Sequence, residues 1–231
     1  MSLNFLKPPP DAAKIFEKAV MPTSSAGHFI AKLSAKNGAA DVAATKLAAQ
    51  GPGVVKNAAE ASQFSKAHQI YSMRLDELAQ GAGLNRARPL GWRYLKTDDR
   101  QSTISVEVYM RREENKPGFA QVSSGPYCQS TLSAFATAEK NPDVQGSRYE
   151  PRLLHVPALS LQALWLQKRT ANLGEQDLFL PLVPMPSFLV GKFYSTGEFL
   201  GILQRAAQAR LSESQPRAEQ QQQRNTQQKN Q

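Results

Sequence analysis

The feature that most constrains the fold is a regular alternation of apolar and polar side chains between residues 103 and 111. Every second position in its middle carries a β-branched aliphatic residue, namely Ile104, Val106 and Val108. Successive side chains of a strand point to opposite faces, so this pattern predicts a strand with one buried face. Residues 90–96 precede it across a turn at Asp98-Asp99 and are expected to form the first strand of a hairpin.

Short extended segments and helices are expected to follow this hairpin. A turn at residues 115–118 leads into a third strand at 119–123. Helices are predicted at 127–140 and, after a cap at Ser195-Thr196, through to Leu211. Residues 151–156 are expected to be extended.

Residues 157–169 fit two different periods. Their apolar side chains alternate as in a strand, but a helix that begins at Pro157 fits the spacing as well. We favour a strand, because residues 177–182 are apolar and would serve as its partner. Prolines within and after that partner predict that it lies at an edge of the sheet.

Several helices are expected before the hairpin. Asp11 occupies the position of an N-cap, which predicts a short helix up to Val20. Residues 26–49 are rich in alanine and favour a helix with little large apolar surface, which is marginal without a partner surface. Residues 54–80 carry apolar side chains at steps of three and four, so they give the best prediction of an amphipathic helix in the chain.

The C-terminal segment has a different composition. Of its last 18 residues, from Ser214 onwards, eight are glutamine, and none is apolar and larger than alanine. Such a segment buries too little surface to offset the entropy of ordering, so we expect disorder, or a helix only against another surface.

Together these patterns predict an α+β fold. We expect a single core with a small, mostly antiparallel sheet packed by helices, preceded by an alanine-rich helical arm and followed by a disordered glutamine-rich tail. The corresponding boundaries are 1–53 for the arm, which is expected to be partly flexible, 54–212 for the core and 213–231 for the tail. No apolar run is long enough to span a membrane, and the first residues lack the apolar run of a secretory signal.

The net charge of +9 is distributed unevenly. Residues 1–75 carry a net +5 and residues 204–231 a net +3, whereas residues 76–125 carry +1 and residues 126–203 are neutral. A basic flank suits an acidic partner such as nucleic acid, an anionic lipid surface or an acidic protein. A solvated helix face explains the same charge more simply, because no five-residue run is dominated by lysine and arginine.

Composition also excludes several kinds of chemistry. Cys128 is the only cysteine, which rules out a disulfide within the chain and a zinc site with several thiolates. The three histidines do not share the spacing of a helical metal site. The common nucleotide, hydrolase and metalloprotease motifs are absent. We therefore predict no cofactor and no metal, and expect the reducing cytoplasm as the compartment.

One arrangement of residues would support catalysis. Cys128 precedes a predicted helix, where the exposed N–H groups favour a thiolate, and His155 and Asp177 lie in or beside later extended segments. This order resembles the core of papain-like and transglutaminase-like enzymes. The resemblance implies a cysteine hydrolase or acyl transferase in which His155 takes the thiol proton and Asp177 orients the imidazole. A buried structural thiol explains the same residues without catalysis.

A second candidate site is basic. Positive side chains interleave with Trp92 and Tyr94, as in surfaces that bind single-stranded nucleic acid or other anions. These side chains are Arg86, Arg88, Arg93 and Lys96. A hairpin with one apolar and one basic face is the simpler interpretation.

The leading functional hypothesis is a non-catalytic protein-interaction or scaffold module that uses its basic helical arm. The partner would be another protein or a second copy of the chain. The two alternatives are the cysteine enzyme and sequence-independent binding of nucleic acid through the basic flanks.

Overall fold

The structure is a computed structural model of the 231-residue chain, and it describes residues 3–20, 66–97, 103–111, 116–145, 148–169 and 174–229. These residues form an α+β fold with one mixed, mostly antiparallel sheet, whose eight strands lie in the order β4-β3-β2-β1-β5-β6-β7-β8. The predicted fold class is therefore confirmed at this level. No helix in these ranges is both long and apolar enough to cross a membrane.

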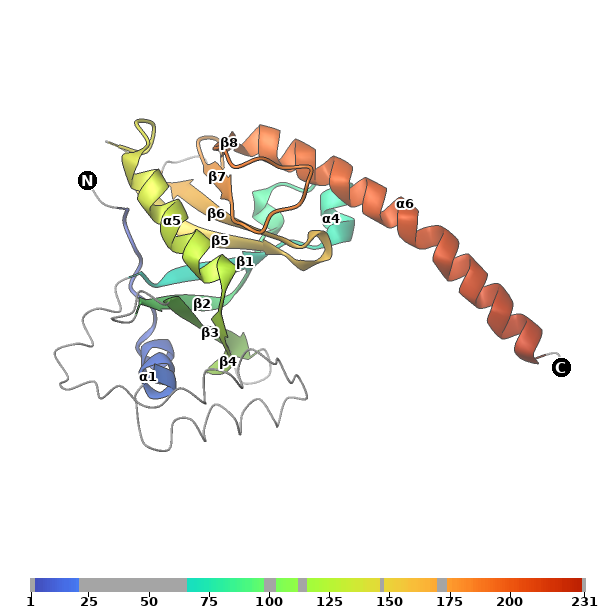
Figure 1. Ribbon diagram of the computed structural model, residues 1–231, viewed down its shortest axis with the longest axis horizontal. Helices are drawn as coiled ribbons and strands as arrows, with labels where there is room; N and C mark the ends of the chain where they lie inside the picture. The colour runs from blue at the N-terminus through green and yellow to red at the C-terminus, as the bar shows by residue number, and fades with distance from the viewer. Residues whose placement is uncertain are drawn as a thin grey trace. The chain divides into compact units, whose positions relative to one another are not determined.

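The elements are labelled in Figure 1. The strands are β1 (His68–Ser72), β2 (Arg88–Thr97), β3 (Thr103–Arg111), β4 (Lys116–Ser124), β5 (Tyr149–Val156), β6 (Leu161–Lys168), β7 (Leu178–Pro181) and β8 (Tyr194–Ser195). The helices are α1 (Pro10–Val20), α4 (Leu75–Ala79), α5 (Pro126–Lys140) and α6 (Thr196–Lys229), with short 3-10 helices η2 (Leu84–Arg86) and η3 (Pro157–Leu159).

The chain divides into two compact units. The first unit comprises Met1–Asn4, Tyr71–Pro89 and Ala134–Gln231, and the second comprises Phe5–Ile70 and Leu90–Ser133. The predicted boundaries at 53 and 212 stay a prediction, since residues 21–65 lie outside the described ranges.

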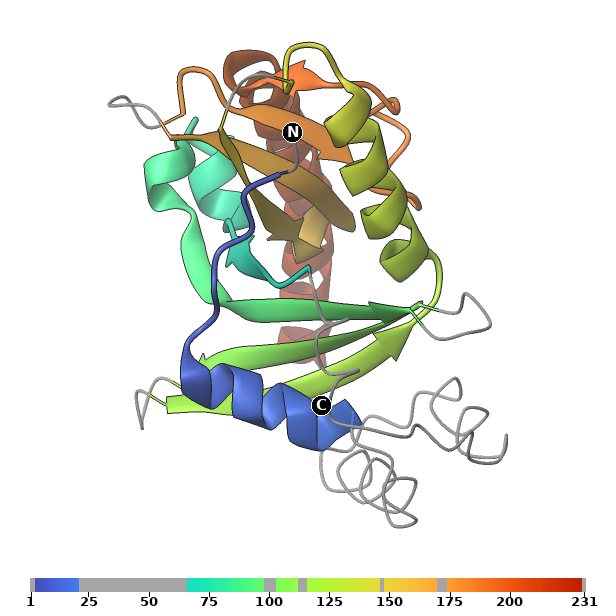
Figure 2. The ribbon, with the colours of Figure 1, turned by 90° about the vertical axis from the view of Figure 1, so that its left-hand side faces the viewer.

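In the second unit, the predicted hairpin is present and α1 covers one of its faces. Trp92 pairs with Val108 and Tyr94 with Val106 across β2 and β3, so the apolar side chains share one face. Helix α1 packs on β3 and β4, as Figure 2 shows, and the ring of its Phe16 stacks on Tyr94 with centroids 4.3 Å apart. Ala12 and Phe16 of α1 are therefore part of a packed core.

In the first unit, strands β5 to β8 form an antiparallel ladder that packs against α6. Three aromatic rings connect the sheet to the helix: Trp165 lies 5.9 Å from Phe179, and Phe179 lies 4.6 Å from Phe199, measured between ring centroids. Helices α4 and α6 lie side by side (Figure 1). Gln208 Nε2 donates to the Ala79 carbonyl at 3.0 Å.

The strand prediction for residues 157–169 is confirmed with a modification. Residues 157–159 form η3, and the strand β6 begins at Leu161. Its predicted partner at 177–182 is β7, which pairs with β6 as expected. The expectation that this partner lies at an edge is wrong, because the two residues of β8 pair with the other side of β7.

The predicted helix over 54–80 is wrong in its described part. Residues 68–72 form the strand β1, and only 75–79 form a helix. His68 and Ile70 are both buried, and side chains two positions apart share one face of a strand. The apolar residues around them are spaced so that they also fit a helix. Residues 54–65 lie outside the described ranges.

Two further expectations differ in detail. Residues 116–118 belong to β4 and not to a turn, and Pro117 is tolerated there because β4 lies at the edge of the sheet. Helix α6 begins at the predicted cap, where Glu198 N donates to Ser195 Oγ at 3.4 Å. Its backbone stays helical to Lys229, through the segment for which we predicted disorder or a partner-dependent helix.

Candidate functional site

A short loop of the first unit carries three exposed large hydrophobic side chains. Large hydrophobic side chains that are exposed in the described residues are Val183 at 55 %, Phe188 at 40 %, Val190 at 58 % and Met110 at 42 %. All but Met110 lie in the loop of residues 182–193, which we call the β7–β8 loop. Apolar side chains that gather on one part of a surface mark interaction sites more often than isolated ones do.

The β7–β8 loop is held in place by its own contacts. Tyr194 accepts a hydrogen bond from the Val190 amide at 3.0 Å, and its hydroxyl donates to the Val190 carbonyl at 3.3 Å. The Leu189 amide donates to the Pro186 carbonyl at 3.1 Å, and the Leu189 side chain is buried in the core. The loop therefore presents Phe188 and Val190 from a fixed backbone, which lowers the entropy lost on binding.

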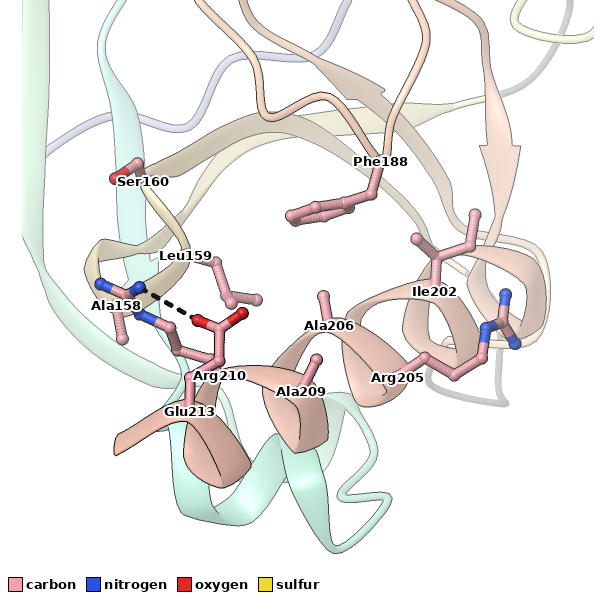
Figure 3. Close-up of a pocket in the computed structure, with 10 residues that line it drawn as sticks. All are labelled: Ala158, Leu159, Ser160, Phe188, Ile202, Arg205, Ala206, Ala209, Arg210 and Glu213. Carbon is pink, nitrogen blue, oxygen red and sulfur yellow. Dashed lines mark ion pairs between the residues drawn. The ribbon is translucent and has the colours of Figure 1, made fainter. Parts of the chain in front are cut away.

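Phe188 borders a groove of about 740 Å³. The groove is lined by residues of η3, of the β7–β8 loop and of α6, which are Ala158, Leu159, Ser160, Phe188, Ile202, Arg205, Ala206, Ala209, Arg210 and Glu213. In Figure 3, Phe188 reaches over the groove from the loop, Leu159 points into it from η3, and the two alanines of α6 form its floor.

Helix α6 has two neighbouring stripes of residues. Phe199, Leu203 and Ala207 are fully buried and anchor the helix to the sheet. A second stripe, at Ile202, Ala206, Ala209 and Glu213, lines the groove, and its Ile202 and Ala206 also pack in part against the core. We call it the groove stripe, and its steps of four, three and four residues keep it on one side of the helix.

The charges of the groove lie at its two ends (Figure 3). At one end, Arg210 Nη1 and Glu213 Oε2 form an ion pair at 3.6 Å, with both side chains well exposed. At the Ile202 end, Arg205 is exposed and pairs with no acidic side chain of the described residues. The lining therefore carries one arginine more than its own carboxylate balances.

The structure gives the surroundings of each residue of the predicted catalytic triad, beginning with Cys128. Cys128 lies in the first turn of α5, where its Sγ is 3.4 Å from Ser105 Oγ and 3.5 Å from the Ser123 carbonyl oxygen, so its one proton can be donated to either acceptor. The thiol is buried. These contacts describe a packed side chain between α5 and the strands β3 and β4.

Asp177 belongs to a separate arrangement in the first unit. Its Oδ2 accepts the indole N–H of Trp165 at 2.8 Å, and its Oδ1 accepts the Lys168 amide at 2.9 Å. His155 pairs with Gln162, six positions from Lys168 along β6. At the rise of a strand, Gln162 and Lys168 are about 20 Å apart. Because His155 lies opposite Gln162 and Asp177 binds the Lys168 amide, the register does not bring Asp177 to His155.

Burial raises the pKa of Asp177, and the hydrogen bonds from Trp165 and Lys168 oppose that rise without cancelling it. Asp177 therefore acts as a buried acceptor that fixes the Trp165 ring in the core. The catalytic interpretation of Cys128, His155 and Asp177 stays a prediction, and the contacts of Asp177 do not favour it.

The four residues of the predicted basic site have different surroundings. Arg88 Nη2 pairs with Glu77 Oε1 at 2.5 Å, and Arg86 is exposed on η2, both in the first unit. Arg93 is buried in the second unit, where it pairs with Glu107. The backbone of Lys96 lies in β2. Two of these four arginine and lysine side chains are thus neutralised by carboxylates, and anion binding by the set stays a prediction.

The pair of Arg93 and Glu107 is the centre of a buried polar cluster. Glu107 Oε1 accepts from Arg93, and its Oε2 accepts from Tyr109 at 2.5 Å and from Gln121 at 3.1 Å. Burial alone would raise the pKa of Glu107, but Arg93 and the hydrogen bonds outweigh it and lower this pKa below its usual value. A carboxylate with both oxygens occupied is a structural group and a poor base.

His68 lies beside this cluster. Its Nδ1 is 2.9 Å from the Lys66 carbonyl, and burial together with the nearby charge of Arg93 lowers the pKa of His68 to about 4. It is therefore neutral at physiological pH. Among the residues that the structure describes, no group of three or more His, Cys, Asp or Glu side chains could hold a metal ion.

No family model, no curated protein and no solved structure matches this chain. The function must therefore be argued from the geometry of its own residues.

Sequence reasoning missed the groove, although two signals of it are present. Residues 182–190 combine a run of apolar side chains with Pro184 and Pro186, which is unusual for a solvated loop. In α6, apolar positions occur on two sides of the helix, more than one packed face requires.

Proposed function

We propose that this protein is a non-catalytic protein-interaction module that binds its partner through the groove between η3, the β7–β8 loop and α6. The observation that carries the proposal is Phe188, an exposed aromatic side chain that lines the groove from a loop held by hydrogen bonds, with the exposed Val190 two residues further along the same loop. Aromatic anchors beside a preformed groove are typical of the centres of protein interfaces.

The basic helical arm that the sequence predicts over residues 1–53 would add a second contact to the partner. Its first helix, α1, is packed on β3 and β4, so its removal would expose the core around Tyr94. The contribution of the arm is therefore tested by deleting residues 21–53 and keeping α1.

A site-specific photo-cross-linker tests the proposal. The cross-linking amino acid replaces Val190 in the full chain, and a matched protein carries it at Ala136, which is exposed on α5 away from the groove lining. Each protein is irradiated in an extract of its source cells. We expect a discrete cross-linked protein from position 190 that is absent from position 136 and disappears when Phe188→Ser is added.

The same products from both positions, or no product from position 190, would overturn the proposal. A product at position 190 that survives Phe188→Ser would also overturn it, because the groove would then not determine the contact.

A further inference from the structure

The shape of the groove stripe suits one kind of binding segment. From Ile202 to Glu213 it covers about three helical turns, or roughly 16 Å of axis at the rise of an α-helix. Its steps of four, three and four residues are the spacing at which the side chains of one helix pack against those of another. Ala206 and Ala209 are small, so the backbone of a second helix can approach α6 closely.

The groove offers little to an extended peptide. A strand that joins a sheet needs a free edge of N–H and C=O groups. The groove lining comes from η3, a loop and a helix, and none of its residues belongs to a strand. A helix satisfies its own backbone and needs only a complementary side-chain surface, so a helix is the better occupant.

The charge of the groove lining favours a partner with an acidic side chain. Arg210 is paired with Glu213, whereas Arg205 pairs with no acidic side chain of the described residues. An acidic side chain beside the apolar face of a bound helix would meet Arg205, and a basic one would be repelled. Such rim charges contribute to specificity and association rate more than to affinity.

The same charges argue against a second copy of α6 in the groove. If two copies of α6 packed antiparallel about Ala206 and Ala209, Arg205 of one would lie opposite Arg210 of the other, and Ile202 would lie opposite Glu213. Like charges directly opposite each other, together with an apolar side chain opposite a carboxylate, disfavour that pairing. The chain is also strongly basic as a whole, with a net charge of +9.

We infer that the groove binds an amphipathic α-helix of another protein, with apolar side chains on the face that meets the groove stripe and an acidic side chain that meets Arg205. This inference rests on the proposed function and names the chemistry of its partner.

Two synthetic peptides test it on the full chain. Both are helical peptides of about five turns, roughly 18 residues, with the same leucine and alanine stripe. One carries glutamate at the flanking positions and the other lysine. Binding of each labelled peptide is measured by fluorescence anisotropy. We expect the glutamate peptide to bind at least about tenfold more tightly than the lysine peptide.

Variants locate the binding. Ala209→Arg fills the floor of the groove from an exposed helical position, and we expect it to lower the affinity for the glutamate peptide by about tenfold or more. Arg205→Glu should lower the affinity for the glutamate peptide by about threefold to tenfold and raise the affinity for the lysine peptide. The control Arg86→Glu makes the same change of charge on η2, away from the groove lining, and should leave the preference unchanged. Thermal melting of each variant confirms that it is folded.

Equal binding of both peptides, binding of neither, or equal effects of Arg205→Glu and Arg86→Glu would overturn the inference. A concentration-dependent mass in sedimentation that Ala209→Arg abolishes would overturn it in favour of a second copy. If both peptides fail while position 190 still cross-links a protein in the Phe188-dependent manner, this inference falls and the proposed function stands.

Discussion

Arg93 on β2 lies directly opposite Glu107 on β3, and both side chains are buried, with Arg93 Nε donating to Glu107 Oε1 at 2.9 Å. Because the pair is buried, the loss of one member leaves the other charged and unsolvated. We expect Glu107→Leu to lower the free energy of unfolding by about 3–5 kcal/mol. Urea denaturation followed by fluorescence measures this change.

The double variant Arg93→Met/Glu107→Leu should recover much of that loss, since an apolar pair carries no unsolvated charge. Arg74→Ala, in the exposed pair of Arg74 and Asp76, serves as the control and should leave the transition unchanged. A Glu107→Leu variant as stable as the control would contradict the structural role of the pair.

His68 is expected to make the protein acid-sensitive. Below pH 6.5 the unfolded chain binds a proton at this residue, but the folded protein does not until the pH approaches its own pKa of about 4, because burial and the facing Arg93 disfavour the charged ring. The free energy of unfolding should therefore fall as the pH is lowered from 6.5 towards 4, by about 3 kcal/mol in full. His68→Gln should show a shallower fall.

The comparison is made by urea denaturation of both proteins between pH 7 and about 5, above the usual range in which Glu107 titrates. Because the pKa of Glu107 is lowered, protonation of Glu107 destabilises the folded protein only at still lower pH. It therefore does not contribute to the loss of stability that is assigned to His68. If the wild type and His68→Gln show parallel pH dependence, His68 does not carry the acid sensitivity.

The alternation around Val106 was sufficient to predict the hairpin. The expectation of a single buried face is wrong, because Ser105 and Glu107 on the polar face are buried as well as Val106 and Val108. The alternation itself is a local pattern, because each side chain's direction follows from its place in the strand, and the structure confirms the two paired strands. The strand at His68–Ser72 was missed for the opposite reason. Its apolar spacing fits a helix equally well, and its place in the middle of the sheet depends on strands that are distant in the sequence.

The groove could not be predicted as a site, because it exists only once η3 and the β7–β8 loop lie beside α6. Phe188 and Ala209 are 21 positions apart in the sequence, and neither belongs to a recognisable motif. The predicted triad illustrates the converse. Sequence order suggests that His155 and Asp177 could meet, but the strand register separates them.

Gly91 is required by the close approach of β3. A Cβ atom at this position would lie 2.1 Å from the Val108 carbonyl oxygen and 2.7 Å from the Tyr109 Cα. Both are backbone atoms within a strand pair and cannot move without breaking the ladder. We expect Gly91→Ala to lower the free energy of unfolding by at least about 2 kcal/mol, measured by urea denaturation.

Gly197→Ala is the matched control, because no atom lies within 4 Å of the added Cβ and the residue lies in the first turn of α6. Its effect should stay within about 1 kcal/mol. Equal effects of the two substitutions would show that space at Gly91 is not the constraint.

Asp177 is expected to matter for stability through its hydrogen bonds. Asp177→Ala leaves the Trp165 indole N–H and the Lys168 amide without their acceptor, at a cost of about 1–3 kcal/mol for the buried indole donor and less for the part-buried amide. Asp177→Asn keeps one acceptor oxygen and should lie between the wild type and alanine. Thermal melting and Trp fluorescence measure both changes, with the exposed Asp143→Ala as the control. An Asp177→Ala variant as stable as Asp143→Ala would show that these hydrogen bonds contribute little.

The alkylation rate of Cys128 tests the cysteine-enzyme hypothesis. The thiol is buried and within hydrogen-bond distance of Ser105 Oγ and the Ser123 carbonyl, so a thiol reagent should reach it only when the second unit opens locally. We expect alkylation of the native protein to be at least about tenfold slower than that of the denatured protein, and His155→Ala to leave the rate unchanged. Mass spectrometry of samples quenched over time measures both rates.

The reference for this measurement is a cysteine at an exposed position of the same helix, in the variant Ala136→Cys/Cys128→Ser, which should react as fast as a free thiol. Slow alkylation of Cys128 beside fast alkylation of the reference assigns the difference to burial. Fast alkylation of native Cys128 that His155→Ala slows would instead mean that the imidazole activates the thiol. That result would revive the papain-like interpretation and place the function in the core, away from the groove on α6.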